Sequence, residues 1–321
     1  MAYSDDARVL VKIAHMYYDD NATQAEIAEQ LGVSRPLISK YLAKARELGI
    51  VQIRIRDELA HPYASIEKRL ERKYGIREVI VVPEALETGI KRSLGQATGR
   101  YLSRVLKKNQ TLAVSGGTTL YEVANQMPYM HIQQFTVVPM IGGIGDELID
   151  IHANQIAVQL AKCLDADYKL LHAPVVVDSV EAKETFLAQS AISEVMETAK
   201  RADIALVGIG GKPEKSTMVQ NYLALENPQV LDEQGVIGDI CYTLIDEKGQ
   251  PSDVSWNERV IAVSIDELRN IPTVIGVAQG EDKLAAIHAA LKGQIIDVLV
   301  TDYPTAETLL NPTDLENTSA S

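Results

Sequence analysis

The chain has 321 residues and a net charge of −13, a length that favours two domains, each able to bury its own core. Its two cysteines lack C-x-x-C spacing and its six histidines form no H-x-x-x-H pair, so we expect reduced, buried thiols, no metal site and no cofactor. The sequence begins with no charged-then-apolar leader and has no apolar run long enough for a membrane span, which predicts a cytoplasmic protein.

The N-terminal region has the pattern of three short helices, of which the second and third form a helix-turn-helix. A helix over residues 5–19 comes first. Thr23 and Glu26 have capping-box spacing at the start of a second helix over residues 24–31. Gly32 ends that helix and provides the turn.

The third helix is the predicted DNA recognition helix. Ser34 is expected to cap it, and Pro36 lies in the first turn, where a missing N–H costs least. A buried stripe recurs at helical spacing: Leu37, Ile38, Tyr41, Leu42, Ala45 and Leu48. The opposite face carries residue types that contact phosphates and base edges. The predicted DNA contacts are Thr23, Gln24, Ser34, Arg35, Pro36, Ser39, Lys40 and Lys44, together with Arg54 from the segment that follows.

A plain helical hairpin with a solvated basic face is the alternative interpretation of this region. Three details favour the helix-turn-helix. Ala28 is small where two helices must approach closely, Gly32 forms the turn, and residues 34–36 read Ser-Arg-Pro at the next helix start.

The charge is divided unevenly along the chain. Residues 1–56 carry +1 and the remaining residues carry −14, whereas residues 21–56 alone carry +3. The acidic character therefore belongs to the second domain. An acidic body disfavours non-specific contact with DNA and leaves binding to the small basic patch.

Two connecting segments follow the third helix. Residues 50–56 alternate apolar and polar side chains and predict a strand, either the wing of a winged helix, with Arg54 or Arg56 at a phosphate, or an ordinary edge strand kept soluble by arginine. Residues 57–75 are highly charged with a thin apolar stripe and predict a helix that ends at Gly75. This helix is either a linker that helps to pair subunits or a solvated helix packed on its own domain.

From Glu78 onward, short apolar runs alternate with helical segments. Near-continuous runs rich in β-branched residues, with helices between them, are typical of parallel strands covered on both faces. The sequence therefore predicts a doubly wound α/β domain. The runs are 79–82, 112–115, 137–140, 204–207, 273–277 and 296–300.

Glycine-rich loops follow several of these runs. Residues 115–119 read Ser-Gly-Gly-Thr-Thr and lead from a strand into a helix, where bare N–H groups and threonine hydroxyls could hold a phosphate. Any single Gly-Gly loop could be only a tight turn. Because ligands bind beyond the carboxyl ends of parallel strands, convergence of this loop with 141–143, 208–211 and 278–280 predicts a small anionic ligand. Lys283 could turn its ammonium toward that ligand or remain a solvated surface lysine.

Three motifs for other chemistry are incomplete. Lys212 is followed by Pro213 rather than Ser or Thr, which breaks the Walker pattern, and that proline also removes the third glycine of a dinucleotide fingerprint. The sequence therefore predicts no nucleotide site. Ala113 replaces the first glycine of a nucleophile elbow, so Ser115 is interpreted as a ligand contact.

With these motifs in view, the chain resembles the SorC family of bacterial sugar-responsive transcriptional regulators, also described with DeoR-type regulators. The resemblance covers nearly the whole chain and rests on the helix-turn-helix, the Ser-Gly-Gly-Thr-Thr loop and Gly-Glu-Asp-Lys at 280–283. Further matching stretches are 139–143, 152–156, 172–174, 236–240, 299–302 and 305–306.

The resemblance implies an N-terminal all-α (winged) helix-turn-helix domain over residues 1–56, a linker helix over 57–75 and a Rossmann-like α/β effector domain over 76–321. That domain would be similar to the fold of sugar-phosphate isomerases, deaminases and CoA-transferases, without catalysis. The family further implies a homotetramer that binds palindromic operator DNA, with half-sites about one helical turn apart or a multiple of it.

The resemblance also assigns effector contacts. The phosphate of a phosphorylated sugar would lie at Gly116, Gly117, Thr118, Thr119 and Lys283, and Asp239 would accept hydrogen bonds from sugar hydroxyls. Some relatives place an aldehyde-reactive lysine where this chain has Ile141, so no covalent adduct is expected. Further candidate contacts are Gly142, Gly143, Asn154, Gln279 and Gly280.

The predicted function is transcriptional regulation of a carbohydrate-utilisation operon by a phosphorylated sugar, with no enzymatic activity. One alternative is a sugar-phosphate isomerase or deaminase fused to a DNA-binding domain, with Asp146 and Glu147 as paired carboxylates that move protons. Another is a DNA-architectural protein without a ligand.

Overall fold

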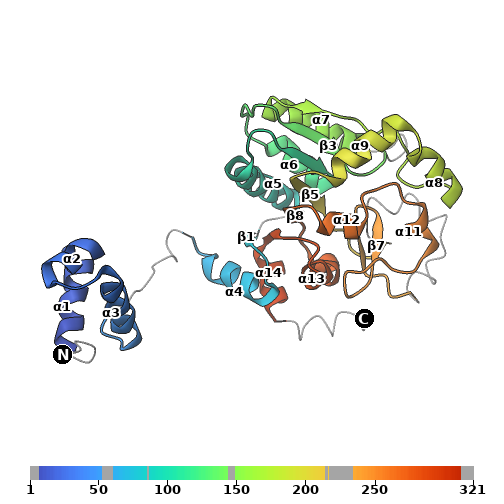
Figure 1. Ribbon diagram of the computed structural model, residues 1–321. Coiled ribbons are helices and arrows are strands. Elements are labelled where there is room, and N and C mark those ends of the chain that lie inside the picture. The colour runs from blue at the N-terminus through green and yellow to red at the C-terminus, as the bar shows by residue number, and fades with distance from the viewer. Residues whose placement is uncertain are drawn as a thin grey trace. The chain divides into compact units, whose positions relative to one another are not determined.

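The computed structural model describes residues 7–52, 61–84, 87–143, 149–213, 216 and 234–311. The chain divides into two compact units, Met1–His61 and Pro62–Ser321, which are described separately (Figure 1). Among the described residues, no helix is both long and apolar enough to cross a membrane. Both cysteines are free, but only Cys241 is buried and Cys163 is half-buried.

The first unit is a small three-helix domain made of α1 (Ala7–Tyr18), α2 (Gln24–Leu31) and α3 (Arg35–Glu47). Helix α3 packs against both α1 and α2. The buried core of this unit takes apolar residues from all three helices: Leu10, Ile13, Met16, Ile27, Ala28, Ile38, Tyr41, Leu42 and Ala45. The predicted arrangement of three helices is therefore confirmed.

The helix ends of this unit agree with the sequence in part. The Thr23 hydroxyl accepts a hydrogen bond from the Glu26 N–H at 3.3 Å, and the Glu26 carboxylate accepts one from the Thr23 N–H at 2.7 Å, which completes the capping box. Gly32 ends α2 with φ +64°. Ser34 occupies the N-cap position of α3, but its hydroxyl makes no capping hydrogen bond.

One further expectation for this unit needs correction, and the predicted wing strand is described only in part. Leu48 is 57% exposed, because α3 ends at Glu47 and Leu48 follows it as the C-cap residue instead of continuing the buried stripe. Residues 50–52, the described part of the predicted wing strand, lie in no strand, although Ile50 and Val51 pack against the core. Residues 53–56, which include Arg54, lie outside the described residues.

The second unit is built on a parallel sheet of seven strands in the order β1-β9-β8-β5-β2-β3-β4. All six predicted runs form strands of this sheet. The remaining strand, β4 at the sheet edge, has only two residues, and its polar sequence did not predict a strand. The strands are β1 (Glu78–Val82), β2 (Thr111–Val114), β3 (Thr136–Pro139), β4 (Asp167–Tyr168), β5 (Ile204–Gly208), β8 (Val274–Val277) and β9 (Val298–Asp302).

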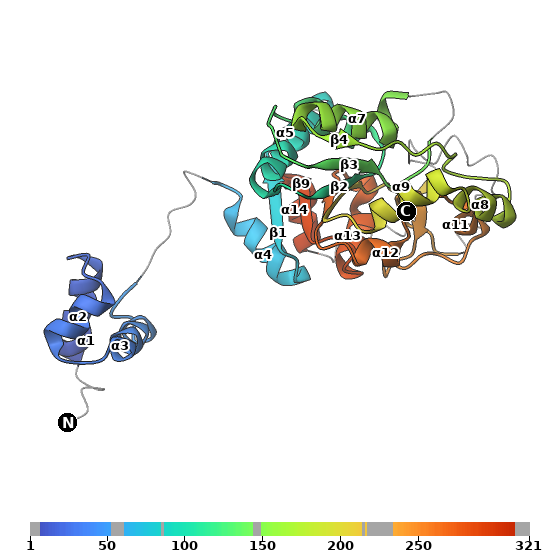
Figure 2. The ribbon, with the colours of Figure 1, turned by 45° about the horizontal axis from the view of Figure 1, so that its top comes forward.

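Helices cover both faces of the sheet (Figure 2). Leu112 and Val114 pack toward α5 (Glu87–Val105), α6 (Thr118–Gln126) and α7 (Ala153–Leu164). Ala113, between them, belongs to the core shared with α9 (Ser190–Lys200), α12 (Ile265–Arg269) and α13 (Leu284–Lys292). Since alternate residues of one strand enter two different cores, the sheet is buried on both faces, and the doubly wound α/β prediction is confirmed.

Smaller elements complete the unit. An antiparallel hairpin of β6 (Gly238–Ile240) and β7 (Thr243–Ile245) stands apart from the main sheet. The sequence analysis did not predict it, because its strands have only three residues each. The remaining described elements are η2 (Ile149–Ile151), α8 (Val180–Leu187), α11 (Ser255–Arg259), η5 (Glu281–Lys283) and α14 (Tyr303–Leu310).

Helix α4 (Ala64–Tyr74) packs against the edge strand β1 and against α14. The Glu67 carboxylate accepts a hydrogen bond from the Val81 N–H at 2.8 Å, and the Glu71 carboxylate accepts one from the Val79 N–H at 3.1 Å. The described part of the predicted 57–75 helix therefore packs on its own domain. Gly75 ends it with φ +67°, as predicted.

Candidate functional site

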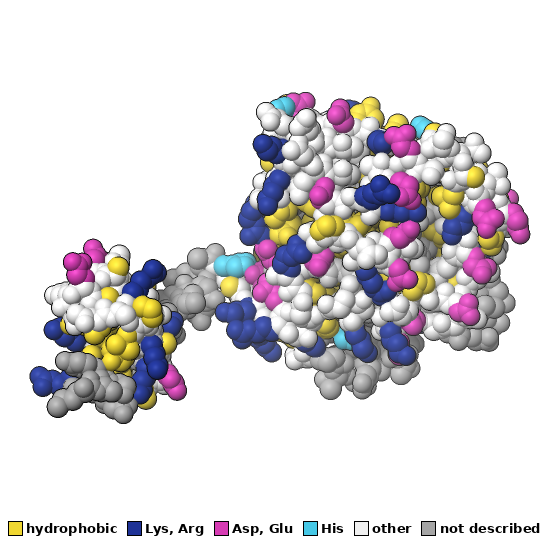
Figure 3. All heavy atoms as spheres, in the orientation of Figure 1, with side chains coloured by type: hydrophobic (Ala, Val, Ile, Leu, Met, Phe, Trp, Pro, Cys, Tyr) yellow, Lys and Arg dark blue, Asp and Glu magenta, His cyan; other side chains and the backbone are white. Residues whose placement is uncertain are grey.

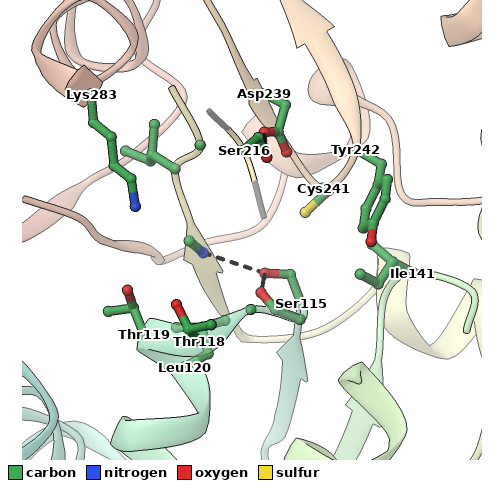
Figure 4. A pocket seen from close by; sticks show the side chains of 15 residues that line it. Ser115, Thr118, Thr119, Leu120, Ile141, Ser216, Asp239, Cys241, Tyr242 and Lys283 are labelled. Atoms are coloured by element: carbon green, nitrogen blue, oxygen red, sulfur yellow. Dashed lines mark hydrogen bonds between the residues drawn. The ribbon is translucent and has the colours of Figure 1, made fainter. Parts of the chain in front are cut away.

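A cavity lies at the carboxyl ends of β2 and β5, which are neighbours in the sheet (Figure 4). From β2 the chain proceeds to β3 on one side, whereas β5 leads to β8 and β9 on the other, so this is the point where the strand order reverses. Ligands of doubly wound sheets bind at such switch points. The lining residues are Ser115, Gly116, Gly117, Thr118, Thr119, Leu120, Ile141, Gly208, Ile209, Gly210, Ser216, Asp239, Cys241, Tyr242 and Lys283.

One end of the cavity is the N-terminus of α6. Gly117 is the N-cap residue with φ +122°, a conformation that favours glycine, and its N–H donates to the Ile151 carbonyl at 2.8 Å. That donor is therefore taken. The N–H groups of Thr118, Thr119 and Leu120 lie in the first turn, where the helix supplies no acceptor. They and the positive end of the helix dipole leave donors for an anion.

Lys283, at the end of η5, points across the cavity toward Thr118 and Thr119 (Figure 4). Among the described residues its ammonium makes no hydrogen bond or ion pair. Burial lowers the pKa of Lys283, as does the positive charge of Lys91, while Asp282 and Asp239 act in the opposite direction. A partly desolvated ammonium without a bonded anion suits an anionic ligand.

Asp239, on β6, lies at another end of the cavity and is buried. Its carboxylate accepts a hydrogen bond from the Ser216 hydroxyl at 2.9 Å. Burial raises the pKa of Asp239 to about 6, although Ser216 and the charge of Lys283 oppose this shift. The carboxylate has acceptor capacity beyond its bond to Ser216, which suits ligand hydroxyl groups.

The loop after β5 approaches Asp239 so closely that it needs glycine. Gly210 and Asp239 exchange backbone hydrogen bonds of 2.9 and 3.2 Å. A Cβ atom at Gly210 would lie 1.9 Å from the Asp239 carboxylate. The glycine predicted as part of a phosphate loop therefore serves to admit this carboxylate.

The turn between β6 and β7 places Cys241 and Tyr242 in the cavity lining. Both have positive φ, +53° and +63°, in a two-residue hairpin turn where Asn-Gly is the usual sequence. The Trp256 indole N–H donates to the Tyr242 carbonyl at 2.7 Å and holds the turn. Burial and the charge of Asp239 raise the pKa of the Cys241 thiol, so it stays protonated. Strained turns of this kind often belong to ligand sites.

Five predicted effector contacts do not line the cavity. A Cβ at Gly142 would lie 2.4 Å from the Pro174 carbonyl, so this glycine serves a close backbone contact, and the Gly143 N–H donates to the Ala173 carbonyl at 2.7 Å. The other three are Asn154, Gln279 and Gly280.

Two of those three residues have structural partners. The Asn154 amide makes hydrogen bonds of 2.9 and 3.0 Å to the backbone of Leu171. The Gly280 N–H donates to the Thr305 hydroxyl at 2.9 Å.

Four residues of the site were missed by the sequence analysis. Lys91, on α5, donates to the Thr118 hydroxyl at 3.1 Å, and no local motif marks it. Ser216 reaches the cavity from the segment that follows β5, whereas Cys241 and Tyr242 reach it from the turn of the hairpin. The closeness of that turn to Asp239 in the sequence was the available signal.

The first unit presents the predicted DNA contacts at its surface. Thr23, Ser34, Arg35, Pro36, Ser39 and Lys40 are exposed, and Gln24 and Lys44 are partly exposed. A hollow at the start of α2 is lined by Thr23, Gln24 and Arg35, among others. Figure 3 shows Lys and Arg side chains, together with a few acidic ones, on the visible face of this unit, and acidic and basic side chains interspersed on the visible face of the larger unit.

Two expectations, the paired carboxylates of an enzyme and the lack of a metal site, remain predictions. Asp146 and Glu147, the carboxylates of the enzyme alternative, lie outside the described residues. Among the residues that are described, no group of three or more His, Cys, Asp or Glu side chains is placed to hold a metal ion.

A helix-turn-helix unit joined to an α/β unit whose cavity is lined in part by Lys283 is the arrangement typical of a DNA-binding protein that also carries a small-molecule site. Comparison with known proteins identifies the family. The family described as "Putative sugar-binding domain" matches residues 60–311, and the winged helix-turn-helix DNA-binding family matches residues 13–52. The chain belongs to the SorC family of transcriptional regulators, with the DeoR-type regulators among its relatives.

The relatives are named as regulators, and the similarity covers nearly the whole length of each. The deoxyribonucleoside regulator of Bacillus subtilis is 32% identical, over 94% of this chain and 96% of its own. The sorbitol operon regulator of Klebsiella pneumoniae is 31% identical, over 97% of this chain and 100% of its own. The crystal structure of that full-length regulator, SorC, superposes with a TM-score of 0.75 at 31% identity and covers 96% of this chain and 100% of SorC. The chain is accordingly a DNA-binding transcriptional regulator with a sugar-binding domain.

Proposed function

We propose that this regulator controls a carbohydrate-utilisation operon and that a phosphorylated sugar, bound in the cavity of the α/β unit, is its effector. The observation that carries the proposal is the pairing of Lys283 with the bare first turn of α6 across a cavity at the sheet switch point. Both features attract an anion. The matching family is described as a sugar-binding domain, which supports a sugar as the rest of the ligand.

The phosphoryl group would bind between the Lys283 ammonium and the N–H and hydroxyl groups of Thr118 and Thr119, with Gly116 and Gly117 keeping the loop close. Hydrogen bonds from ammonium to phosphate are charge-assisted and among the stronger ones in proteins. The sugar hydroxyls would donate to Asp239. Ile141 faces the cavity as an inert side chain, so binding is reversible and non-covalent.

In this proposal the chain works in the cytoplasm as a homotetramer on palindromic operator DNA and carries out no catalysis. The exposed face of α3, with Arg35, Ser39 and Lys40, would enter the major groove. Effector binding would favour one arrangement of subunits and so change the fit of paired recognition helices to their half-sites. Coupling of this kind amounts to about 1–3 kcal/mol per site.

The proposal is tested by thermal unfolding of the full chain against a panel of sugar phosphates and the matching free sugars. A phosphorylated member should raise the melting temperature, because a ligand that binds only the folded state stabilises it, and its free sugar should raise it far less. Lys283→Ala should abolish the shift. Lys162→Ala removes an exposed lysine on α7 and serves as the matched control.

Three outcomes would count against the proposal. Equal shifts with free sugars would exclude a phosphate requirement, and turnover of the stabilising ligand would favour the enzyme alternative. No shift with any member, together with operator binding that Lys283→Ala leaves unchanged, would favour a DNA-architectural protein.

A further inference from the structure

Lys91 is a second cation beside the cavity. It is half-buried on α5, and its ammonium donates to the hydroxyl of Thr118 at 3.1 Å. Among the described residues it makes no ion pair with a carboxylate. Thr118 itself lines the cavity and is the first residue of α6.

The position of Lys91 is unfavourable in the absence of an anion. The N-terminus of a helix carries partial positive charge, so a lysine there is repelled by the helix dipole. Lys283 lies across the same helix start, and the charge of Lys91 lowers its pKa. Of the two described acids that act on Lys283, Asp282 is exposed to solvent, where its field is screened, and Asp239 is bonded to Ser216. Among the described residues, two ammonium groups and a helix N-terminus thus converge with little compensation.

The hydrogen bond from Lys91 also determines what Thr118 can do. A hydroxyl has one donor hydrogen and two acceptor lone pairs, and an ammonium has donors only. Lys91 must therefore occupy an acceptor position of the Thr118 oxygen. The hydroxyl hydrogen stays available to a ligand oxygen in the cavity that Thr118 lines.

We propose that Lys91 is the second cation of the effector site and the positioning residue of Thr118, so that the site is built for a phosphoryl dianion rather than a singly charged acid. The proposal rests on the proposed function, since it concerns the same cavity. It adds the charge class of the ligand: a phosphate monoester is favoured over the corresponding sugar acid, whose carboxylate carries one charge.

Inorganic phosphate is the probe for the test. The melting temperature of the full chain is measured at graded phosphate concentrations at pH 8, with sodium chloride holding the ionic strength constant. Each variant is referred to its own melting temperature in chloride, so a change in stability does not imitate lost binding. The variants are Lys91→Met, Lys91→Arg, Thr118→Val, the double variant Lys91→Met/Thr118→Val, and Lys162→Met as the exposed-lysine control.

Lys91→Met should weaken phosphate binding by about tenfold or more, as expected for a hydrogen bond with a charged partner. Lys91→Arg should restore most of the affinity, because it keeps the charge and a donor. The double variant should bind no more weakly than about the weaker single variant, because both changes remove one linked contact. Lys162→Met should titrate like the wild type.

The results that overturn the inference differ from those that overturn the proposed function. Wild-type phosphate affinity in Lys91→Met, no rescue by Lys91→Arg, or fully additive losses in the double variant would each reject the role of Lys91. If phosphate fails to stabilise even the wild type, the phosphorylated effector itself is rejected, and with it the inference. If Lys283→Ala abolishes phosphate binding while Lys91→Met does not change it, the function stands and the inference falls.

Discussion

The two ends of the effector cavity are built in different ways. At the end formed by Thr118 and Thr119, the loop and its backbone donors come from one continuous segment, in which a strand, a glycine turn and a helix start follow one another, and Lys283 and Lys91 are added from η5 and α5. The end at Asp239 is assembled from two separate segments, the one after β5 that contains Gly210 and Ser216 and the small hairpin of β6 and β7. The first kind of end can be recognised from a local motif, whereas the second depends on packing that brings separate segments together.

The largest effect of a substitution on the free energy of unfolding is expected at Gly210, at the Asp239 end of the cavity. Gly210→Ala would place a Cβ against the Asp239 carboxylate and should destabilise the unit by about 3 kcal/mol, the upper range for overpacking, and remove binding of the sugar moiety. Gly208→Ala, in the same segment, meets its nearest atom at 3.8 Å and is the control. Chemical unfolding of both variants measures the effect. Equal free energies of unfolding for Gly210→Ala and Gly208→Ala would show that the Asp239 side chain can move aside at little cost.

A second test uses the charge of Asp239. Its pKa is raised from 3.8 to about 6 in the folded chain, so between these pH values the folded state binds a proton that the unfolded state does not. The free energy of unfolding should therefore fall as pH rises from about 4 to about 6 and then level off. Asp239→Asn should lack this decline, a difference of up to about 3 kcal/mol.

Urea unfolding across pH 4 to 8 measures this difference. Asp253→Asn, at an exposed position, serves as the control for loss of one acidic charge. Parallel pH profiles for wild type and Asp239→Asn would mean that the carboxylate is not desolvated as the structure has it.

The smallest effect is expected at the phosphate end in the absence of ligand. Lys283→Met removes a partly desolvated charge that has no bonded anion among the described residues, so the free energy of unfolding should rise by about 1 kcal/mol or less. Lys162→Met should leave stability unchanged. A clear loss of stability in Lys283→Met, measured by urea unfolding at pH 7, would show that the lysine has a structural role.

The contrast between local motifs and contacts of separate segments also explains which features could be predicted from the sequence. The capping box at Thr23, the turn at Gly32 and the six apolar runs are local signals, and the structure agrees with each. Ser34 looks like Thr23 in sequence, yet its hydroxyl makes no cap. Whether a cap forms depends on backbone geometry that residue types alone do not fix.

At the site, the glycine loops were recognised but not their separate uses. The 142–143 loop packs on the backbone near Pro174 instead of lining the cavity, and Asn154 bonds to Leu171. Lys91 lies on a helix without any motif and reaches the cavity only through tertiary packing. Such contacts between distant segments are the part that spacing in the sequence does not provide.

Helix α4 protects the edge of the sheet against pairing with a strand of another molecule. An exposed edge strand is a template for strand addition by another chain. Because Glu67 and Glu71 occupy N–H groups of β1, a second molecule cannot extend the sheet there, and the opposite edge, β4, is only two residues long and includes Asp167. A fragment of the α/β unit that begins after α4 would therefore expose an adhesive edge and aggregate, whereas one that begins at Pro62 would keep it covered.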